Sequence, residues 1–353
     1  MRFGLSEEQT LLQDNVMRFL SEQAPLDTVR TYADGGSDQN IWSGLIELGI
    51  GALLVPEHAG GLGMTPLDAA IVAECLGYHT TPAPFLGSAA IAPTALSGSG
   101  THTQLLEGLV DGSVRIGVDF GAATGARADA QLSIDENNTA NGRSLFVFDD
   151  AATHYLIADA HHHLYLADAA HVNRTVLTTV DKTRRCVQVD YNNTPVEVVS
   201  KDPAVFLQAL DTGRIMLAAD TLGAAQNMLD QAVEYAKQRE QFNRPIGSFQ
   251  AVKHMCAEMA AELEPCRAMV WFAAHAAKDL PDEARVTACH TKAHLAEVGK
   301  FVAKTSTEVH GGMGFTDLLG LHYWFKRCGA NRQWLGAPEL VREEAAALQN
   351  LTA

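Results

Sequence analysis

Two stretches in the C-terminal part of the chain combine residue types that bind anions. The first runs from Arg239 to Gln250, where a basic turn separates two segments of helical periodicity. Arg239 and Arg244 lie close to the start of the second helix, where unpaired backbone N–H groups and the helix dipole favour a negative charge. On residue types alone, these arginines equally well complement the dipole of the helix that ends there. The stretch is a candidate anion site, with helix capping as the open alternative.

The second stretch is a glycine-rich turn, His310-Gly311-Gly312-Met313-Gly314-Phe315-Thr316. Three glycines within four positions let the backbone approach a ligand closely, as turns that hold phosphate groups require. An ordinary helix C-cap accounts for much of this pattern as well. Together, the two stretches predict a site for a diphosphate.

The charge of the chain is unevenly distributed. The 26 Lys+Arg and 42 Asp+Glu give a net charge of −16, which argues against a nucleic acid or an anionic membrane as a partner. Residues 1–200 carry 10 basic and 24 acidic residues (−14), and residues 201–353 carry the remaining 16 and 18 (−2). We therefore expect the basic residues that bind an anionic cofactor to lie in the C-terminal part.

The cysteines and the lack of long apolar segments indicate the cellular compartment, and the histidines do not have the pattern of a metal site. Six cysteines without a C-x-x-C pair predict reduced, mostly buried thiols. The start of the chain lacks the apolar run of a signal peptide, and no segment has the roughly eighteen apolar residues of a membrane span. The run His161-His162-His163, with His154 and His171, is typical of a solvated turn, because consecutive strand residues point to opposite faces. We expect a cytoplasmic protein without a metal.

The periodicity of apolar residues divides the chain into three parts, and their order predicts an α+β fold. Residues 1–110 have helical periodicity, with a cap at Ser6, a helix over Ile41–Leu48 and another cap at Thr65. Residues 111–200 form a small β domain, and residues 201–353 return to long helices near 204–240, 249–279 and 282–310. The strands expected in the β domain are separated by Asp-Asp, Asn-Asn and Asn-Gly turns; they are Arg115–Asp119, Leu145–Phe148, Tyr155–Ala158, Leu164–Ala167, Val187–Tyr191 and Val196–Val199.

Four motifs, in order along nearly the whole chain, resemble the acyl-CoA dehydrogenase family. They are Phe3–Gln9, the run from Leu48 through Val55-Pro56-Glu57 to Gly60-Gly61-Leu62-Gly63, Arg239–Gln250 and His310–Phe315. The resemblance implies an N-terminal helical domain, a central β domain and a C-terminal four-helix bundle around a cleft for FAD and an acyl-CoA thioester.

The resemblance also implies which residues meet the cofactor. Arg239, Phe242 and Gln250, with Gln241 in the same motif, would contact the ADP part of an FAD whose flavin lies mainly on the neighbouring subunit. His310 and the glycines Gly311, Gly312 and Gly314 would hold its diphosphate. Such a shared site implies an obligate oligomer.

The chain departs from the family pattern at the catalytic base. Desaturation of an acyl-CoA needs a carboxylate that removes the α proton while the flavin accepts the β hydride. The family places this glutamate either before a glycine ahead of the last helix or before an arginine on the first C-terminal helix. Here these positions hold Leu335, before Gly336, and Gly213, before Arg214. We therefore predict no catalytic residue in this chain; Glu339, Asp211 and Asp317 are the candidates for a displaced base.

The β domain departs from the pattern as well. The segment Val118–Asp129 keeps only small residues where flavin-binding members carry Thr-Glu-Pro and Gly-Ser-Asp, so we expect its flavin and acyl pocket to be degenerate. This combination resembles the non-catalytic subunit of the heterotetrameric α2β2 acyl-CoA dehydrogenases of bacterial steroid side-chain degradation. The implied partners are a second subunit that carries the base, an acyl-CoA substrate and an electron-transfer flavoprotein.

Two other readings remain open from the sequence. In the first, the chain is a homo-oligomeric acyl-CoA dehydrogenase with a displaced carboxylate base. In the second, it is a structural subunit that binds no flavin.

Asp211 and Arg214 match positions that touch CoA in the family. Trp324, Lys326 and Arg327 lie on a helix near the FAD turn, where interface packing and function are equally consistent with their types.

Overall fold

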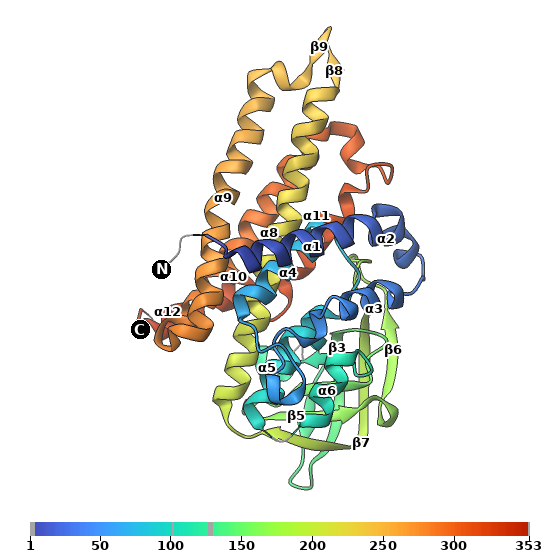
Figure 1. Cartoon of the computed structure of the whole chain (residues 1–353), viewed down its shortest axis with the longest axis vertical. Helices are drawn as coiled ribbons and strands as arrows, with labels where there is room; N and C mark the ends of the chain where they lie inside the picture. Colours follow the sequence, from blue (N-terminus) through green and yellow to red (C-terminus); the bar gives the residue numbers. More distant parts are fainter. Residues whose placement is uncertain (1–3, 101, 126–129, 352–353) are drawn as a thin grey trace.

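The computed structural model describes residues 4–100, 102–125 and 130–351 (Figure 1). Phe3 of the first motif and residues 126–129 of the Val118–Asp129 segment lie outside the described residues. An N-terminal helical domain is followed by a curled sheet and a C-terminal helical domain, so the predicted fold class is confirmed. The long helices extend well beyond the other two parts toward one end of the molecule (Figure 1).

The N-terminal domain is built from short helices whose first turns are capped by their own side chains. In α1 the Ser6 hydroxyl accepts from the Gln9 N–H at 3.1 Å, and the Ser6 N–H donates to the Gln9 side chain at 3.0 Å. Thr65 and Asp68 form the same capping box at α4, so both predicted caps are confirmed. The helices are α1 Glu7–Gln23, α2 Leu26–Ala33, α3 Gln39–Glu47, α4 Pro66–Tyr78, the π-helix η3 Leu86–Ile91, α5 Ala92–Ser99 and α6 Thr103–Asp111, with 3-10 turns η1 Ile50–Ala52 and η2 Glu57–Ala59.

The sheet has the strand order β1-β4-β5-β7-β3-β2, with β6 also paired to β7. Only β1 and β4 run parallel among the described pairs; the others are antiparallel. The elements are β1 Ile116–Asp119, α7 Gly121–Thr124, β2 Leu132–Ile134, β3 Thr139–Phe148, β4 His154–Ala158, β5 Leu164–Asp168, η4 Ala169–His171, β6 Asn173–Leu177 and β7 Cys186–Ser200.

Two of the predicted turns in this sheet are wrong. The Asn192-Asn193 pair does not separate two strands, because β7 runs through it. Strand β3 pairs with β7 residues on both sides of the pair, and β5 pairs with β7 from Val196 onward. The Asn141-Gly142 pair lies within β3, at a register shift against β7. Local turn residues here mark irregularities of continuous strands, since long-range pairing outweighs the turn preference. The predicted Asp149-Asp150 turn does separate β3 from β4.

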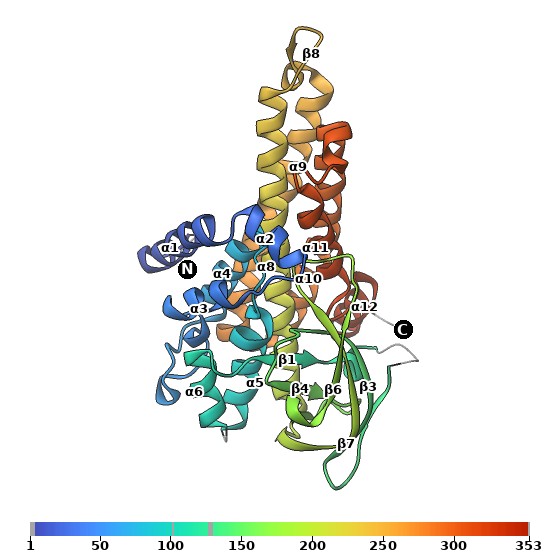
Figure 2. The same cartoon turned by 90° about the vertical axis from the view of Figure 1, so that its right-hand side faces the viewer.

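The C-terminal domain consists of antiparallel long helices. They are α8 Pro203–Gln238, α9 Gln250–Asp279, α10 Pro281–His310, α11 Leu321–Gln333 and α12 Pro338–Leu348, with η5 Ile246–Ser248 and η6 Gly311–Phe315. With 36 residues, α8 is about 54 Å long. A two-strand hairpin, β8 Glu240–Gln241 and β9 Arg244–Pro245, joins α8 to α9 at the far end of the molecule from the sheet (Figure 2).

Helix α8 crosses α4 of the N-terminal domain at backbone contact. A Cβ atom on Gly77 would lie 1.9 Å from the Asp220 carbonyl oxygen, and one on Gly223 would lie 1.9 Å from the Glu74 carbonyl oxygen. Only glycine permits this approach on both helices. The crossing buries a core shared by α4, α8, α9 and α10, so the two helical domains are packed as one unit.

The three domains meet at a buried ion pair between Asp220 of α8 and Arg327 of α11. Arg327 Nη2 lies 2.6 Å from an Asp220 oxygen, and its Nη1 donates to the Thr81 carbonyl and to the Thr183 hydroxyl at 3.1 and 3.0 Å. Burial alone would raise the pKa of Asp220, but the Arg327 guanidinium holds it below its usual value. Arg327 is 3% exposed and Trp324 is also buried, so both serve internal packing rather than an outer surface near the glycine turn.

The variant Arg327→Met should lower the free energy of unfolding by about 3–5 kcal/mol, because it leaves the Asp220 carboxylate buried without its partner. Urea unfolding measures this loss. Lys326→Met, one position away on the same helix, is the matched control and should change stability by less than about 0.5 kcal/mol. Equal stability of the two variants would show that the junction does not depend on the ion pair.

Candidate functional site

The residues predicted to bind the cofactor gather at the tip of the long helices. The β8–β9 hairpin has a two-residue loop, Phe242 and Asn243, and both residues have positive φ values of 54° and 60°. This is the backbone of a type I′ turn, which aromatic residues adopt rarely. It directs Phe242 into solvent with 87% of its surface exposed. An aromatic side chain held this way is available to a ligand or to another subunit.

The two arginines of the first stretch have different environments. Arg244 stacks on the Phe249 ring, with its guanidinium carbon 4.0 Å from the ring centroid. Arg239 ends α8 as its C-cap, is exposed, and makes no side-chain ion pair with any described residue. Gln250 begins α9 next to this turn. Among the described residues, neither arginine has an ion-pair partner; Arg244 is held by its ring contact, whereas Arg239 has no such contact.

The glycine turn lies beside the end of α8. The His310 ring packs on Tyr235 at a centroid distance of 4.7 Å, and Tyr235 lies one helical turn before Arg239. The His310 Nδ1 atom is 2.7 Å from the Ser306 carbonyl, and burial lowers its pKa, so this side chain anchors the turn as a neutral ring. Gly311, with φ +58°, and Gly312 are exposed backbone. The fold thus brings the two predicted stretches together.

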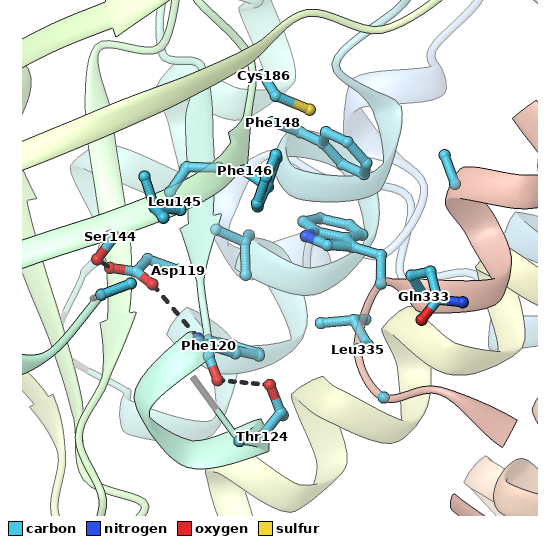
Figure 3. A pocket seen from close by; sticks show the side chains of 18 of the residues that line it. Asp119, Phe120, Thr124, Ser144, Leu145, Phe146, Phe148, Cys186, Gln333 and Leu335 are labelled. Atoms are coloured by element: carbon cyan, nitrogen blue, oxygen red, sulfur yellow. Dashed lines mark hydrogen bonds between the residues drawn. The ribbon is translucent and has the colours of Figure 1, made fainter. Parts of the chain in front are cut away.

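A second candidate region is a cavity of about 820 Å³ between the sheet and the C-terminal domain (Figure 3). It is bounded by β1, β3, the loop before β7, the end of α11 and the start of α12. Four aromatic side chains are among the described residues of its wall, and the ring centroids of Phe148 and Trp334 lie 3.8 Å apart. A cavity is therefore present in the region where the sequence predicts a degenerate flavin and acyl pocket.

The two positions that carry the family's base lie against each other beside this cavity. Leu335 follows α11 and is 4% exposed. A Cβ atom on Gly213 of α8 would lie 2.5 Å from Leu335 Cδ1 and 2.7 Å from Ile91 Cδ1 of the π-helix η3. Three elements thus close an apolar contact at the two positions predicted for the base. Neither position offers a group that accepts a proton.

A cluster of four charged side chains surrounds the turn of α8 that holds Gly213. Arg214 donates to the Leu335 carbonyl at 3.0 Å and pairs with Glu344 at 2.8 Å, and Arg285 pairs with Asp211 at 3.1 Å. Burial raises the pKa of Asp211 to about 6, although both arginines oppose the shift. Asp211 and Arg214 thus form ion pairs within this cluster, and Arg214 also holds the Leu335 loop through its backbone carbonyl.

The other carboxylates considered as displaced bases lie on the surface. Glu339 is exposed and accepts from Arg332 at 2.8 Å; a hydrogen bond from its own backbone and this contact lower its pKa. Asp317 is exposed beside Arg30. Neither lines the cavity among the described residues. Of the three candidates, only Asp211 has the burial of a general base.

Asp119 is a buried carboxyl in the cavity wall that the sequence reasoning missed. It accepts from the Tyr191 hydroxyl at 3.3 Å, from the Gly121 N–H at 3.4 Å and from the Ser144 hydroxyl. Burial raises its pKa. It ends a strand, next to a segment rich in small residues, and no local signal distinguishes it from an ordinary strand end.

A buried lysine supports the loop that carries Leu335. Lys292 of α10 is 2% exposed and donates to the carbonyls of Asn331 and Arg332 at 2.7 and 3.2 Å. These are unpaired carbonyls at the end of α11. Burial, together with the charges of Arg214 and Arg332, lowers the pKa of Lys292 to about 7. The amine caps α11 immediately before Trp334 and Leu335.

The tip and the cavity are too far apart to form one site within a chain. Gly213 and Arg239 are 26 residues apart on α8, which corresponds to about 39 Å. Figures 1 and 2 both place the β8–β9 hairpin at the end opposite the sheet. A ligand that needs both regions must take them from two different chains.

Other expectations concern groups outside these two regions. All six cysteines are free thiols, five of them buried, as predicted. In the part of the chain that is described, no three His, Cys, Asp or Glu side chains gather as a metal site. His163 instead contacts Asp159, and the His162 ring stacks on Phe206 at 4.6 Å. None of the described helices combines the length and apolar character that a membrane span requires.

Comparison with known proteins agrees with this architecture. The acyl-CoA dehydrogenase N-terminal domain matches residues 6–111, and the C-terminal domain of the same family matches residues 204–348. The acyl-CoA dehydrogenase IpdE2 of Mycobacterium tuberculosis (strain ATCC 25618 / H37Rv) is 32% identical over 338 residues, which cover 95% of each chain. The chain belongs to the acyl-CoA dehydrogenase family. This is a family of oxidoreductases that act on CH–CH bonds.

Two solved structures are similar to this chain over almost their whole length. A variant of the Tcur3481-Tcur3483 steroid ACAD has a TM-score of 0.88 and 27% identity, covering 98% of both chains. The ChsE4-ChsE5 complex from Mycobacterium tuberculosis has a TM-score of 0.91 and 24% identity over both full chains, which shows the shared fold. Both are assemblies of two different proteins, as their names state.

The variant Gly213→Ala should lower the free energy of unfolding by about 1–3 kcal/mol, because the added methyl group must displace Leu335 or Ile91. Urea unfolding provides the measurement. Gly329→Ala is the matched control, since a Cβ atom there meets nothing within 4 Å; it should raise helix stability by about 0.5–1 kcal/mol. A Gly213→Ala protein as stable as the unsubstituted chain would refute the close apolar contact.

Lys292 should make stability rise with pH. Its pKa is lower in the folded protein than in the unfolded chain, so the unfolded state holds one more proton between about pH 7 and pH 10. The free energy of unfolding should therefore increase by roughly 2 kcal/mol between pH 7 and pH 9 relative to Lys292→Met. Lys300→Met, an exposed position on the same helix, should keep the pH dependence of the unsubstituted protein. Parallel curves for all three proteins would contradict the assignment.

Proposed function

We propose that this chain is one subunit of a flavin-dependent acyl-CoA dehydrogenase that desaturates an acyl-CoA thioester between its α and β carbons. A second family subunit carries the base and the catalytic flavin pocket, and this chain supplies the other half of the FAD site. The contact of Leu335 with Gly213 and Ile91 carries the proposal, because both family base positions hold groups that cannot take a proton.

The residues at the tip fit a dinucleotide. Arg239 provides an unpaired cation for the diphosphate. A Cβ atom at Gly311 or Gly312 would meet nothing within 4 Å, so a phosphate group can approach this backbone closely. Phe242 offers a ring face, and Gln241 and Gln250 offer amides, for the adenosine end; Gly314 and His310 keep the turn packed. The chemistry that FAD supplies when bound is the acceptance of a hydride from the substrate.

The role of this chain is then to bind and orient, with no proton transfer of its own. The similarity to a two-protein steroid ACAD supports a heterotetramer and an acyl group derived from a steroid side chain. An electron-transfer flavoprotein is the expected oxidant of the reduced complex. The free thiols suit a reducing compartment, so we place the complex in the cytoplasm.

A second candidate function is a homo-oligomeric acyl-CoA dehydrogenase with a displaced base. The observation in its favour is that two buried carboxyls, Asp119 and Asp211, have raised pKa values near the cavity. A raised pKa suits proton abstraction. In that case the chain alone binds FAD fully and turns over acyl-CoA, and Asp119→Asn or Asp211→Asn abolishes turnover.

Flavin stoichiometry distinguishes these functions. The chain should be expressed alone and together with the product of a neighbouring gene of the same family, and FAD should be measured per chain by absorbance. We expect one FAD for every two chains in the complex, and an inactive chain when it is expressed alone. One FAD per chain with full activity of the lone chain would overturn the proposal in favour of the homo-oligomer.

The variant Arg239→Ala tests the cofactor contact within the complex. Loss of the cation should weaken FAD binding more than about tenfold, because a charge-assisted contact to phosphate contributes more than about 1.4 kcal/mol. Equilibrium dialysis with FAD measures this change. Arg342→Ala, an exposed arginine on α12, is the control and should retain its FAD. Unchanged FAD content in Arg239→Ala would favour a structural subunit without a flavin role.

A further inference from the structure

We propose that Arg30 of helix α2 is a positioning residue for the glycine turn, because it holds segment 316–320, which joins that turn to α11. This inference rests on the proposed function, in which the glycine turn binds the diphosphate of FAD. It adds the N-terminal domain to the tip site, since Arg30 lies 287 positions before Asp317, one of the residues that it contacts.

Two backbone carbonyls of this segment accept hydrogen bonds from the Arg30 guanidinium. Its Nη2 atom donates to the carbonyls of Asp317 and Leu318, to the second at 3.0 Å. Hydrogen bonds from a charged donor are stronger than those from a neutral one. Within the described part of the chain, no other side chain donates to these two carbonyls. Both residues are exposed, so packing of their own side chains does little to fix them.

A second contact from α2 supports the end of the same segment. Gly320 has a φ of +66°, and a Cβ atom there would lie 2.6 Å from Leu26 Cδ2. Leu26 therefore packs directly on the backbone where the segment enters α11. Leu26 and Arg30 are four positions apart, which places them on the same face of a helix. One face of α2 thus holds the segment at two points (Figure 1).

Helix α2 is itself fixed to the β domain by another arginine. The guanidinium carbon of Arg185 lies 4.3 Å from the centroid of the Tyr32 ring, and its Nη2 donates to the Tyr32 carbonyl at 3.0 Å. The Nη1 atom of Arg185 lies 3.2 Å from an Asp150 oxygen. The C-terminal end of α2 is therefore anchored, and the helix is a firm support for the segment before α11.

The supported segment continues directly from the glycine turn. The N–H and the hydroxyl of Thr316 both donate to the Met313 carbonyl, at 3.0 and 2.8 Å. Thr316 immediately precedes Asp317, whose carbonyl Arg30 holds. A Cβ atom on Gly312 would meet nothing within 4 Å, so the open side of the turn has no packing that fixes it. The position of the turn therefore depends on the contacts that flank it.

The same arginine also lies beside a carboxylate near the proposed anion site. Arg30 Nε lies 3.7 Å from one oxygen of Asp317, and His322 Nε2 lies 3.5 Å from the other. A carboxylate so near the glycine turn in the sequence would oppose a diphosphate if its charge were not offset. Arg30 could thus act on FAD through the charge of Asp317 instead of through the backbone, and the test must distinguish these effects.

The test measures amide hydrogen exchange of the lone chain and FAD binding of the complex for Arg30→Met. We expect the amides of residues 311–320 to exchange at least about tenfold faster, with those of α8 unchanged, because two charge-assisted hydrogen bonds are lost. FAD binding, measured by equilibrium dialysis, should weaken at least about threefold, since the apparent affinity falls with the fraction of molecules in the binding conformation.

Three further variants isolate the backbone contacts. Arg30→Lys keeps a cationic donor and should bind FAD more tightly than Arg30→Met. The double variant Arg30→Met/Asp317→Asn should bind FAD as weakly as Arg30→Met. Full recovery in the double variant would show that Arg30 only offsets the carboxylate, and would overturn the inference. Arg18→Met, at an exposed position of α1, is the matched control and should behave like the unsubstituted chain.

The outcomes separate this inference from the proposed function. Faster exchange confined to residues 311–320 together with weaker FAD binding in Arg30→Met supports the inference. Unchanged exchange there, or equally faster exchange in α8, would overturn it, and the Arg239→Ala result would still decide the function. Faster local exchange with unchanged FAD binding also overturns it, while the function stands if Arg239→Ala weakens FAD binding. If neither substitution changes the FAD content of the complex, both the inference and the proposed function fail.

Discussion

The ion pair between Asp220 and Arg327 is the constraint on which the domain arrangement depends. Two buried charges are unfavourable unless each has its full set of partners. The partners of Arg327 come from three places: Asp220 of α8, Thr81 of the N-terminal domain and Thr183 of the β domain. The three domains must therefore dock together, and the glycine contact of α4 with α8 permits the close packing that excludes water from the pair.

This docking fixes α8 as the axis of the molecule and gives its two ends different environments. One end lies near the cavity and the charged cluster around Arg214, and Arg239 at the other end is exposed next to the β8–β9 hairpin. Figure 1 shows this hairpin at the end of the molecule opposite the sheet. The uneven charge follows the same division. The acidic surplus belongs to the first 200 residues, whereas the part that presents Arg239 and the glycine turn is nearly neutral.

The cavity lies beside Leu335, which has no side-chain group that accepts a proton. Leu335 and Ile91 fill the small space above Gly213, and Arg214 and Lys292 hold the surrounding loop through backbone carbonyls. These contacts stabilise the wall independently of any bound cofactor. The cavity beside these contacts remains because the Asp220–Arg327 junction positions the sheet and α11. Neither Leu335 nor Gly213 takes part in that junction.

The sequence by itself determined the helical and strand parts, the caps at Ser6 and Thr65, the residues of the two tip stretches and the apolar types at both base positions. These features depend on neighbours within a few residues or on residue type alone. Only the tertiary structure decided that β7 is continuous, that Arg327 is internal, that Asp119 faces the cavity and that Leu335 meets Gly213. Asp220 and Arg327 are 107 positions apart, and contacts over such separations follow from the packing of whole domains, which local periodicity does not encode.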